Sequence, residues 1–197
     1  MKITVYCGAS LGNNPRHHDA TEQLADWLVA NQHTLVYGGG RAGLMGLLAD
    51  RVLAHGGEVI GIMPTFLQAR ELAHNGLTEM ISVASMTERK AKLIELGEAY
   101  IALAGGPGTL EEIIEVISWA RIGQNNNPCI LFDSDGYYQP LQAMFRQMVE
   151  QGFLTQADFE KTLFSNDLKE VGDFIANYTP PAIRQYTFAK PVLQSQP

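Results

Sequence analysis

Short, almost wholly apolar runs alternate along this chain with longer segments in which apolar residues recur every three or four positions. Runs that are apolar throughout, rather than at every second position, are typical of strands buried on both faces of a parallel sheet. Six runs have this character and are expected to be strands: 3–8, 34–39, 58–63, 80–85, 100–105 and 128–133.

The longer segments predict amphipathic helices, because their apolar side chains fall on one face at helical spacing. The segments expected to be helical are 19–31, 43–55, 86–97, 108–122, 137–151 and 167–176. Strands and helices that alternate in this way predict an α/β fold, a single-domain Rossmann-like, doubly wound parallel sheet with helices on both faces. Such folds bind ligands at the carboxyl ends of the strands, near the reversal of strand order.

Two segments fit neither pattern. Residues 64–79 are too many for a plain connection between elements, and we expect them to contribute to a site. Residues 181–197 contain several prolines and no clear period, which predicts a C-terminal tail. The remaining residues, 1–180, are expected to form one nucleotide-binding domain.

Composition restricts the class of protein. Of the 197 residues 46% are hydrophobic, and the net charge is −7, which argues against a general nucleic-acid-binding protein. Cys7 and Cys129 both lie in strand-like runs and are interpreted as buried thiols of a reducing compartment. The chain begins directly with a strand, and no apolar run approaches the roughly 20 residues that span a membrane. A cytoplasmic protein with no membrane partner is expected.

Glycine-rich turns follow three of the expected strands, at 7–12, 38–43 and 104–108. The carboxyl ends of parallel strands lie at one edge of the sheet, so the three turns are expected to converge on one crevice.

The second turn, GGGRAG, fits the G-x-G-x-x-G pattern of dinucleotide-binding sites. That pattern also requires an acid about 20 residues later, at the carboxyl end of the next strand. Glu58 has this separation but begins its strand, so we expect it at the opposite edge of the sheet. Two interpretations stay open for this turn: glycines that allow tight turning and close helix packing, or contact with a phosphate or ribose.

The third turn combines glycines with the start of a helix. Gly105, Gly106 and Gly108 can present backbone N–H groups without obstruction by a Cβ atom, and a helix N-terminus attracts anions. Thr109 is expected to cap this helix, with Thr109-x-x-Glu112 as a capping box.

Two adjacent carboxylates follow this turn. Glu111 and Glu112 project about 100° apart around the helix, with Glu112 toward the mouth of the turn and Glu111 away from it. Glu112 is therefore either a partner in the cap or an acid that serves a bound ligand.

A pair of cations favours the second interpretation. Ser85-x-x-Glu88 predicts another capping box, which places Arg89 and Lys90 just after the first turn of the next helix. Cations are unfavourable near the positive end of the helix dipole unless an anion lies close by. A phosphate cradle, a forked cation and a carboxylate in one crevice suit chemistry on a sugar phosphate, since a carboxylate can activate water and stabilise an oxocarbenium-like centre.

These residues resemble a known family. AGGPGTLEE is similar to the P-G-G-x-G-T-x-x-E motif of the LONELY GUY (LOG) family, the cytokinin-activating phosphoribohydrolases and their bacterial relatives. The resemblance extends to YCGASLGNNP, LVYGGGRAGLMG, GGEVIGIMP, RELAHNGLTE, MTERK, VISWARIGQNNNP and DSDGYY, and covers residues 2–180 in the order of the family.

The resemblance implies hydrolysis of the N-glycosidic bond of a nucleoside 5′-monophosphate, such as AMP or a cytokinin riboside 5′-monophosphate, to a free base and ribose 5-phosphate. It implies no metal or organic cofactor, and a homodimer with the site close to the interface. Arg89 and Glu112 would be the catalytic pair. The residues expected to line the nucleotide site are Glu71, near the base, and Lys90, Gly105, Gly106, Gly108, Thr109 and Glu111.

Two positions depart from the family pattern. Ala104 replaces a proline of the glycine motif, and Thr87 replaces a histidine often found before the Arg-Lys pair. The first change leaves the backbone N–H groups in place, and the second bears on substrate preference rather than on the reaction.

Other functions are alternatives to this one. A non-catalytic carrier of a nucleotide or of the molybdenum cofactor would share the fold and the glycine turns. A pyridoxal-dependent decarboxylase needs a Schiff-base lysine backed by an acid, and only Lys90 and Lys92 are expected near the crevice. The histidines show no metal-ligand spacing, and His17 and His18 are expected to lie on the surface.

Overall fold

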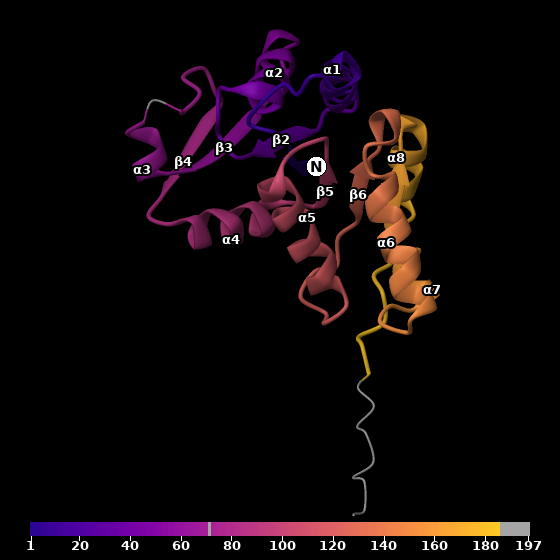
Figure 1. Ribbon diagram of the computed structural model, residues 1–197. Helices are drawn as coiled ribbons and strands as arrows, with labels where there is room; N and C mark the ends of the chain where they lie inside the picture. Colours follow the sequence, from indigo (N-terminus) through magenta and orange to yellow (C-terminus); the bar gives the residue numbers. More distant parts are fainter. Residues whose placement is uncertain (71, 186–197) are drawn as a thin grey trace, which may run out of the picture.

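The computed structural model describes residues 1–70 and 72–185, which form one seven-stranded parallel sheet with the strand order β4-β3-β2-β1-β5-β6-β7 (Figure 1). The strands are β1 (Lys2–Tyr6), β2 (Thr34–Tyr37), β3 (Val59–Pro64), β4 (Glu79–Val83), β5 (Ala99–Ala102), β6 (Cys129–Phe132) and β7 (Thr162–Ser165).

The strand order reverses beside β1, in the middle of the sheet. The chain adds β2, β3 and β4 on one side of β1 and then returns to add β5 on the other, in the register Ile3↔Ala99 to Tyr6↔Ala102. This reversal is the topological switch point at which ligands bind in open α/β sheets.

Helices cover both faces of the sheet, which confirms the predicted architecture. Their bounds are α1 (Pro15–Ala30), α2 (Gly43–Ala54), α3 (Thr65–Gln68), α4 (Met86–Leu96), α5 (Pro107–Ala120), α6 (Gln139–Glu150), α7 (Gln156–Phe159) and α8 (Leu168–Ala176), with the 3-10 turn η1 (Ser134–Gly136). Side chains of α1, α2 and α8 share one hydrophobic core with the sheet, and side chains of α4, α5 and α6 share the other. In Figure 1, α1 and α2 lie above the central strands and α4 and α5 below them.

All six predicted strands and all six predicted helices are present, with ends displaced by up to four residues. The sequence analysis did not identify β7 or the one-turn helices α3 and α7. The β7 strand, TLFS, has only two apolar residues, Leu163 and Phe164, between a threonine and a serine, so it carries no recognisable apolar run.

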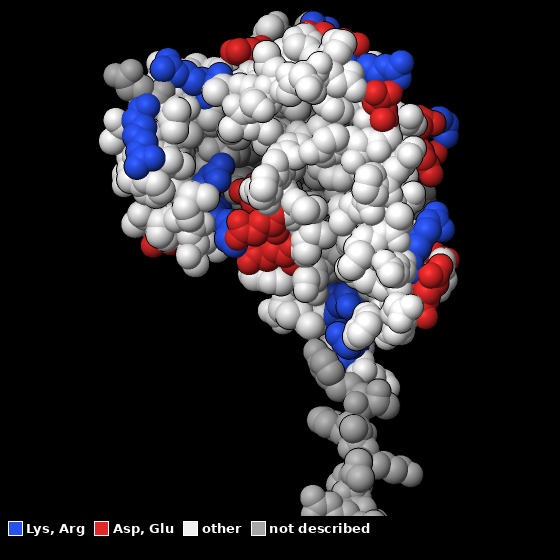
Figure 2. Space-filling model, viewed as in Figure 1, with Lys and Arg blue, Asp and Glu red and all other residues white. Residues whose placement is uncertain are grey.

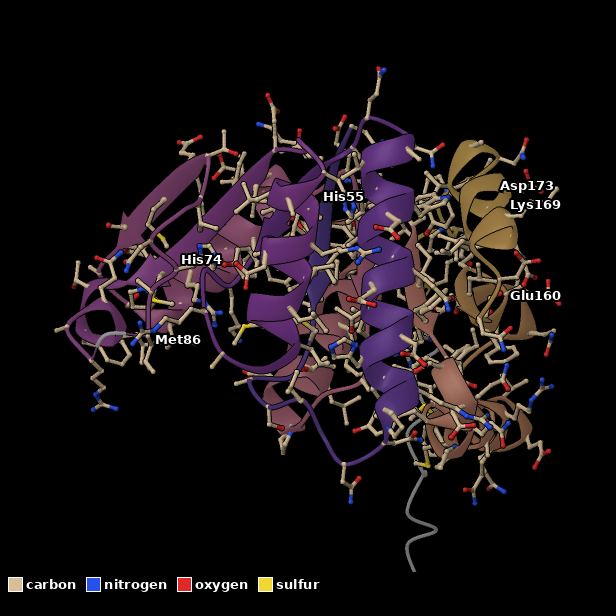
Figure 3. The ribbon with its side chains drawn as sticks, turned by 90° about the horizontal axis from the view of Figure 1, so that it is seen from above. His55, His74, Met86, Glu160, Lys169 and Asp173 are labelled. Atoms are coloured by element: carbon tan, nitrogen blue, oxygen red, sulfur yellow. The ribbon has the colours of Figure 1, made fainter. Side chains whose placement is uncertain are left out.

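The long connection between β3 and β4 contacts the second glycine turn. Gly40 and Ala73 form an antiparallel bridge, and the backbone N–H of His74 donates to Gly39 O over 3.0 Å. Figure 3 shows His74 beside α2, where its Nε2 lies 3.0 Å from Oδ1 of Asp50. The connection is therefore fixed against the edge of the sheet at which the turns meet.

The described part of the predicted tail lies against the C-terminal end of α5. The N–H of Arg184 donates to Arg121 O over 2.9 Å, and Ile183 lies against Gly123. The rest of the tail, residues 186–197, lies outside the described residues. None of the helices within residues 1–70 and 72–185 has the length and apolar character needed to cross a membrane.

Candidate active site

The first and third glycine turns meet at the switch point between β1 and β5. The N–H of Gly8 donates to Ala104 O over 3.0 Å, and a Cβ atom on Gly105 would lie 2.9 Å from the nitrogen of Gly8. Between them is a cavity of about 280 Å³, whose lining includes Ser10 and Gly106. The predicted convergence of the turns is confirmed here.

The second turn packs against the first one. Gly43 has φ +62°, and a Cβ atom there would lie 2.3 Å from the backbone of Ala9. Glycine is needed at this position because it combines a left-handed conformation with close backbone approach. Glu58 accepts from the Thr34 hydroxyl at the amino ends of the strands, as expected for a residue outside a dinucleotide site.

The predicted cap of α5 is wrong. The helix begins at Pro107 with Gly106 as its N-cap, so Thr109 lies in the first turn and is buried. Pro107 explains the earlier start, since proline favours the first helical position, where its missing N–H costs no helical hydrogen bond. Glu112 is therefore one turn inside the helix and takes no part in a capping box, and its carboxylate is available for another partner.

The predicted cap of α4 is present. The Ser85 hydroxyl accepts from the N–H of Glu88 over 3.2 Å, and the Glu88 carboxylate accepts from the N–H of Ala84 over 2.8 Å. This cap fixes the first turn of α4 and places Arg89 on the side of the helix that faces the sheet edge.

Arg89 and Glu112 contact one another across the gap between α4 and α5. Nη1 of Arg89 lies 3.3 Å from Oε1 of Glu112, and both side chains are largely buried, at 12% and 15% exposure. Arg89 also donates from Nε to Ile62 O over 3.1 Å and from Nη2 to Gly38 O over 3.2 Å. Three protein acceptors thus fix the plane of the guanidinium group.

Gly38 leaves the space that Arg89 occupies. A Cβ atom on Gly38 would lie 1.8 Å from Nη2 of Arg89, so any larger residue would displace the guanidinium group. The second glycine turn therefore contributes to the site by admitting this cation.

Burial raises the pKa of Glu112 above its ordinary value, although nearby Arg89 lowers it. Glu111 and Glu115 raise it further by charge repulsion. Burial is the main cause that raises the pKa of the Cys7 thiol, and the charge of Glu112 raises it further. Cys7 directly follows β1, beside the site. A raised pKa makes the Glu112 carboxylate a stronger proton acceptor than an ordinary glutamate.

Lys90 belongs to a second, outer group of charges. Its Nζ lies 2.8 Å from Glu111 and 3.2 Å from Glu115, and the hydrogen bond to Glu111 raises the pKa of Lys90. Figure 2 shows these blue and red atoms side by side between α4 and α5. Two carboxylates pair with Lys90, and its place in the lining of the nucleotide site stays a prediction.

The site residues expected from the sequence thus fall into two places. Gly105 and Gly106 line the cavity at the switch point, while the charged residues lie between α4 and α5. Gly108 has open space where a Cβ atom would be. Glu71 lies outside the described residues.

The sequence analysis missed residues that follow β6. The hydroxyl of Tyr137 donates to Gly105 O over 2.5 Å, and that of Tyr138 donates to Leu103 O over 2.7 Å. Their signal was the DSDGYY segment, which was noted only for its resemblance to the family. His17, expected on the surface, also lines the cavity, next to Tyr137.

Two comparisons of sequence define the family. A family profile described as "Possible lysine decarboxylase" matches residues 45–175. The cytokinin riboside 5′-monophosphate phosphoribohydrolase of Rhodococcoides fascians is 40% identical over 168 residues, which are 85% of each chain. The enzyme of the same name, LOG3, from Arabidopsis thaliana is 41% identical over 179 residues, or 91% of this chain and 83% of its own.

The chain belongs to the LOG family. Solved structures agree with this assignment at the level of the fold. The molybdenum cofactor binding protein of Rippkaea orientalis aligns with a TM-score of 0.67 over 89% of this chain and 94% of its own, at 19% identity. At this identity the similarity concerns the architecture alone.

The description of the family profile does not fit the lysines at this LOG-family site. A Schiff-base lysine must lose its proton readily, but the carboxylates beside Lys90 hold its pKa above the ordinary value. Lys92 pairs with Glu95 at 2.9 Å on the exposed side of α4. Within the described part of the chain, no three His, Cys, Asp or Glu side chains gather into a group that could hold a metal ion.

Proposed function

We propose that this LOG-family protein hydrolyses the N-glycosidic bond of nucleoside 5′-monophosphates, with AMP or a cytokinin riboside 5′-monophosphate as substrate. The main support is the buried contact between Arg89 and Glu112, at the sheet edge where the glycine turns meet. The names of the relatives in Rhodococcoides and Arabidopsis support the same reaction.

The substrate would extend from the glycine-lined cavity toward the charged pair. Its 5′-phosphate would accept hydrogen bonds from backbone N–H groups at the start of α5, where the helix dipole favours an anion. Gly106 and Glu112 are separated by about 9 Å along the helix axis, a distance that a nucleoside monophosphate can bridge. The ribose then lies beside Glu112.

Each reacting group has a matching side chain. Glu112 accepts a proton from water as the water oxygen attacks C1′, and its negative charge stabilises the oxocarbenium-like centre. The bond between C1′ and the base nitrogen breaks, and the electron pair leaves with the base. Arg89 stays protonated and stabilises the departing base through its remaining N–H groups. The water contributes OH to the sugar, and the proton that Glu112 took from it passes on to the base, which returns Glu112 to its carboxylate form.

The partners of the enzyme belong to the same proposal. We propose a homodimer, cytoplasmic, with no nucleic-acid or membrane partner. The net charge of −7 supports the absence of nucleic acid, and the two buried free thiols, Cys7 and Cys129, support a reducing compartment. Exposed apolar side chains on α5 and α6, Leu110 and Met144, lie together with Leu141 on a surface that a second copy could cover.

The reaction is tested by incubating the protein with AMP and with isopentenyladenosine 5′-monophosphate, and by chromatography of the products. We expect free base and ribose 5-phosphate in equal amounts. If the wild-type protein binds these nucleotides without releasing base, the carrier function replaces the proposed one.

A further inference from the structure

The cavity at the switch point has one wall of side chains for which the proposed reaction gives no role. His17 of α1 and Tyr137, which follows η1, line it together with the first and third glycine turns. Among the described residues that line this cavity, His17 alone has a side chain that can carry a positive charge. The other lining residues offer backbone, hydroxyl, amide or apolar groups.

The imidazole ring of His17 is held in one orientation. Its Nδ1 lies 3.1 Å from Oγ of Ser134, and its ring meets Tyr137 edge to face, with 5.2 Å between the centroids. Ser134 is itself buried. The neighbouring Asp135 carboxylate accepts from Nδ2 of Asn14 over 2.7 Å and also pairs with Arg16, so the first turn of α1 and η1 are tied together.

The second ring nitrogen of His17 remains available. Cδ2, the carbon bonded to Nε2, lies 3.6 Å from the position that a Cβ atom on Gly12 would take, so this edge of the ring adjoins the first glycine turn. No hydrogen-bond partner for Nε2 occurs in the described part of the chain. When the Ser134 hydroxyl donates to Nδ1, the ring proton resides on Nε2, which is then a donor at the cavity.

The same wall also holds the anion-binding turn. Tyr137, against which His17 packs, donates to the carbonyl oxygen of Gly105. A trans peptide directs its C=O and N–H groups in opposite directions, so this bond fixes the orientation of the N–H of Gly106. His17 and the turn thus both contact Tyr137.

We infer that His17 is a phosphate-binding residue: its Nε2–H donates to the 5′-phosphate of the substrate, and Ser134 is the positioning residue that holds the ring. The inference rests on the proposed function, since it assigns the cavity to the phosphate of a nucleotide. It adds one side-chain donor to a site otherwise made of backbone N–H groups.

The test compares two adjacent histidines. His17→Phe keeps a ring against Tyr137 and removes both nitrogens. His18→Phe makes the same change at a histidine that does not line the cavity and whose Nδ1 lies 4.0 Å from Glu22. We expect His17→Phe to raise the KM for AMP and the inhibition constant of ribose 5-phosphate by on the order of 10-fold, as for loss of a hydrogen bond to a charged group. The kcat should change by less than about 3-fold, and His18→Phe should match the wild type.

Two further variants separate binding from folding. His17→Gln retains an N–H donor and should recover part of the loss, while Ser134→Ala should weaken ribose 5-phosphate binding by a smaller factor. The double variant His17→Phe/Ser134→Ala should bind no more weakly than His17→Phe alone, because Ser134 acts through His17. Thermal unfolding of each variant checks that the fold is intact.

The inference is overturned if His17→Phe binds ribose 5-phosphate as tightly as the wild type does. It is also overturned if His17→Phe weakens the binding of adenosine, which has no phosphate, as much as the binding of AMP. Calorimetric titration with ribose 5-phosphate gives this answer without turnover. Failure of the proposed function has a different result, namely that the wild-type protein releases no base from any nucleotide tested.

Discussion

A buried carboxylate beside a fixed guanidinium group determines what this site can do. Glu112 is costly to ionise because of its burial, and Arg89 only partly compensates. The guanidinium group is fixed in orientation because it donates hydrogen bonds to the carbonyl oxygens of Ile62 and Gly38. The pair therefore combines a proton acceptor with a permanent cation at one position.

Replacement of the carboxylate tests its chemical role. We expect Glu112→Gln to lower kcat for AMP by about 10²- to 10⁴-fold, the usual contribution of a general base, while nucleotide binding is retained. Glu95→Gln on α4, which removes an exposed carboxylate paired with Lys92, is the control and should keep full activity. An active Glu112→Gln enzyme would assign the proton transfer to another group.

Glu112→Gln is also expected to change the thermal stability of the protein in a pH-dependent way. The folded-state pKa of Glu112 is raised, so the folded protein binds this proton more tightly than the unfolded chain does. The resulting stabilisation is present at acid pH and is lost as the pH rises through the folded-state pKa. Glu112→Gln should therefore raise the melting temperature more at pH 8 than at pH 4, by about 2–4 °C for each kcal/mol of burial cost removed. Equal shifts at both pH values would contradict this.

A substitution at Gly38 tests whether the position of the Arg89 guanidinium group matters, without changing a charged residue. Gly38→Ala brings a Cβ atom to within 1.8 Å of Nη2 of Arg89, and the guanidinium group must move. A displacement of about 1 Å in a catalytic group can cost 10²-fold in rate, so we expect kcat to fall by about 10- to 100-fold in a folded protein. Steady-state kinetics and circular dichroism together check the prediction. Wild-type kinetics would show that Arg89 need not occupy this position.

At the scale of elements, helix starts decide where the functional side chains lie. The Ser85 cap was readable from the sequence because the serine and Glu88 have the spacing of a capping box, and the structure has both hydrogen bonds. The start of α5 was misread because Thr109 and Glu112 show the same spacing. Pro107 was the better guide, since it occupies the first helical position.

Helix α8 offers a stabilising change away from the site. Gly172 lies in its middle, with helical neighbours on both sides, and a Cβ atom there would make an ordinary contact of 3.6 Å with Trp27. Gly172→Ala should therefore raise the free energy of unfolding by about 0.4–1 kcal/mol, measured by urea denaturation, without any change in kcat. It is also the matched glycine control for Gly38→Ala. A destabilised variant would mean that Trp27 leaves no room for the methyl group.

At the scale of the whole molecule, most of the architecture could be predicted from the sequence. Apolar runs identified six of the seven strands, and their alternation with helices predicted a sheet covered on both faces. Contacts between distant positions could not be predicted in this way. The space that Gly38 leaves for Arg89, 51 residues later, and the bond from Tyr137 to Gly105 depend on which strands become neighbours.

The proposed dimer is tested at the same scale. Met144 is 49% exposed on α6, and Met144→Asp places a charge on the apolar surface beside Leu110. We expect this change to convert a dimer into a monomer, measured by light scattering after gel filtration. Ala143→Asp, on the same helix, adds the same charge away from that surface and should leave the dimer intact. If Met144→Asp stays dimeric, the interface lies elsewhere.

The central place of β1 has a consequence for synthesis of the protein. Each residue of β1 from Ile3 to Tyr6 pairs with a residue of β5 that lies 96 positions further along the chain, as in Ile3↔Ala99. At a ribosomal rate of about 5–20 residues per second, one edge of β1 remains without its partner strand for about 5–20 seconds, until β5 has been synthesised. During this interval a nascent strand presents unpaired N–H and C=O groups to other chains. Folding of this enzyme in the cell should therefore depend on how well chaperones shield its first hundred residues.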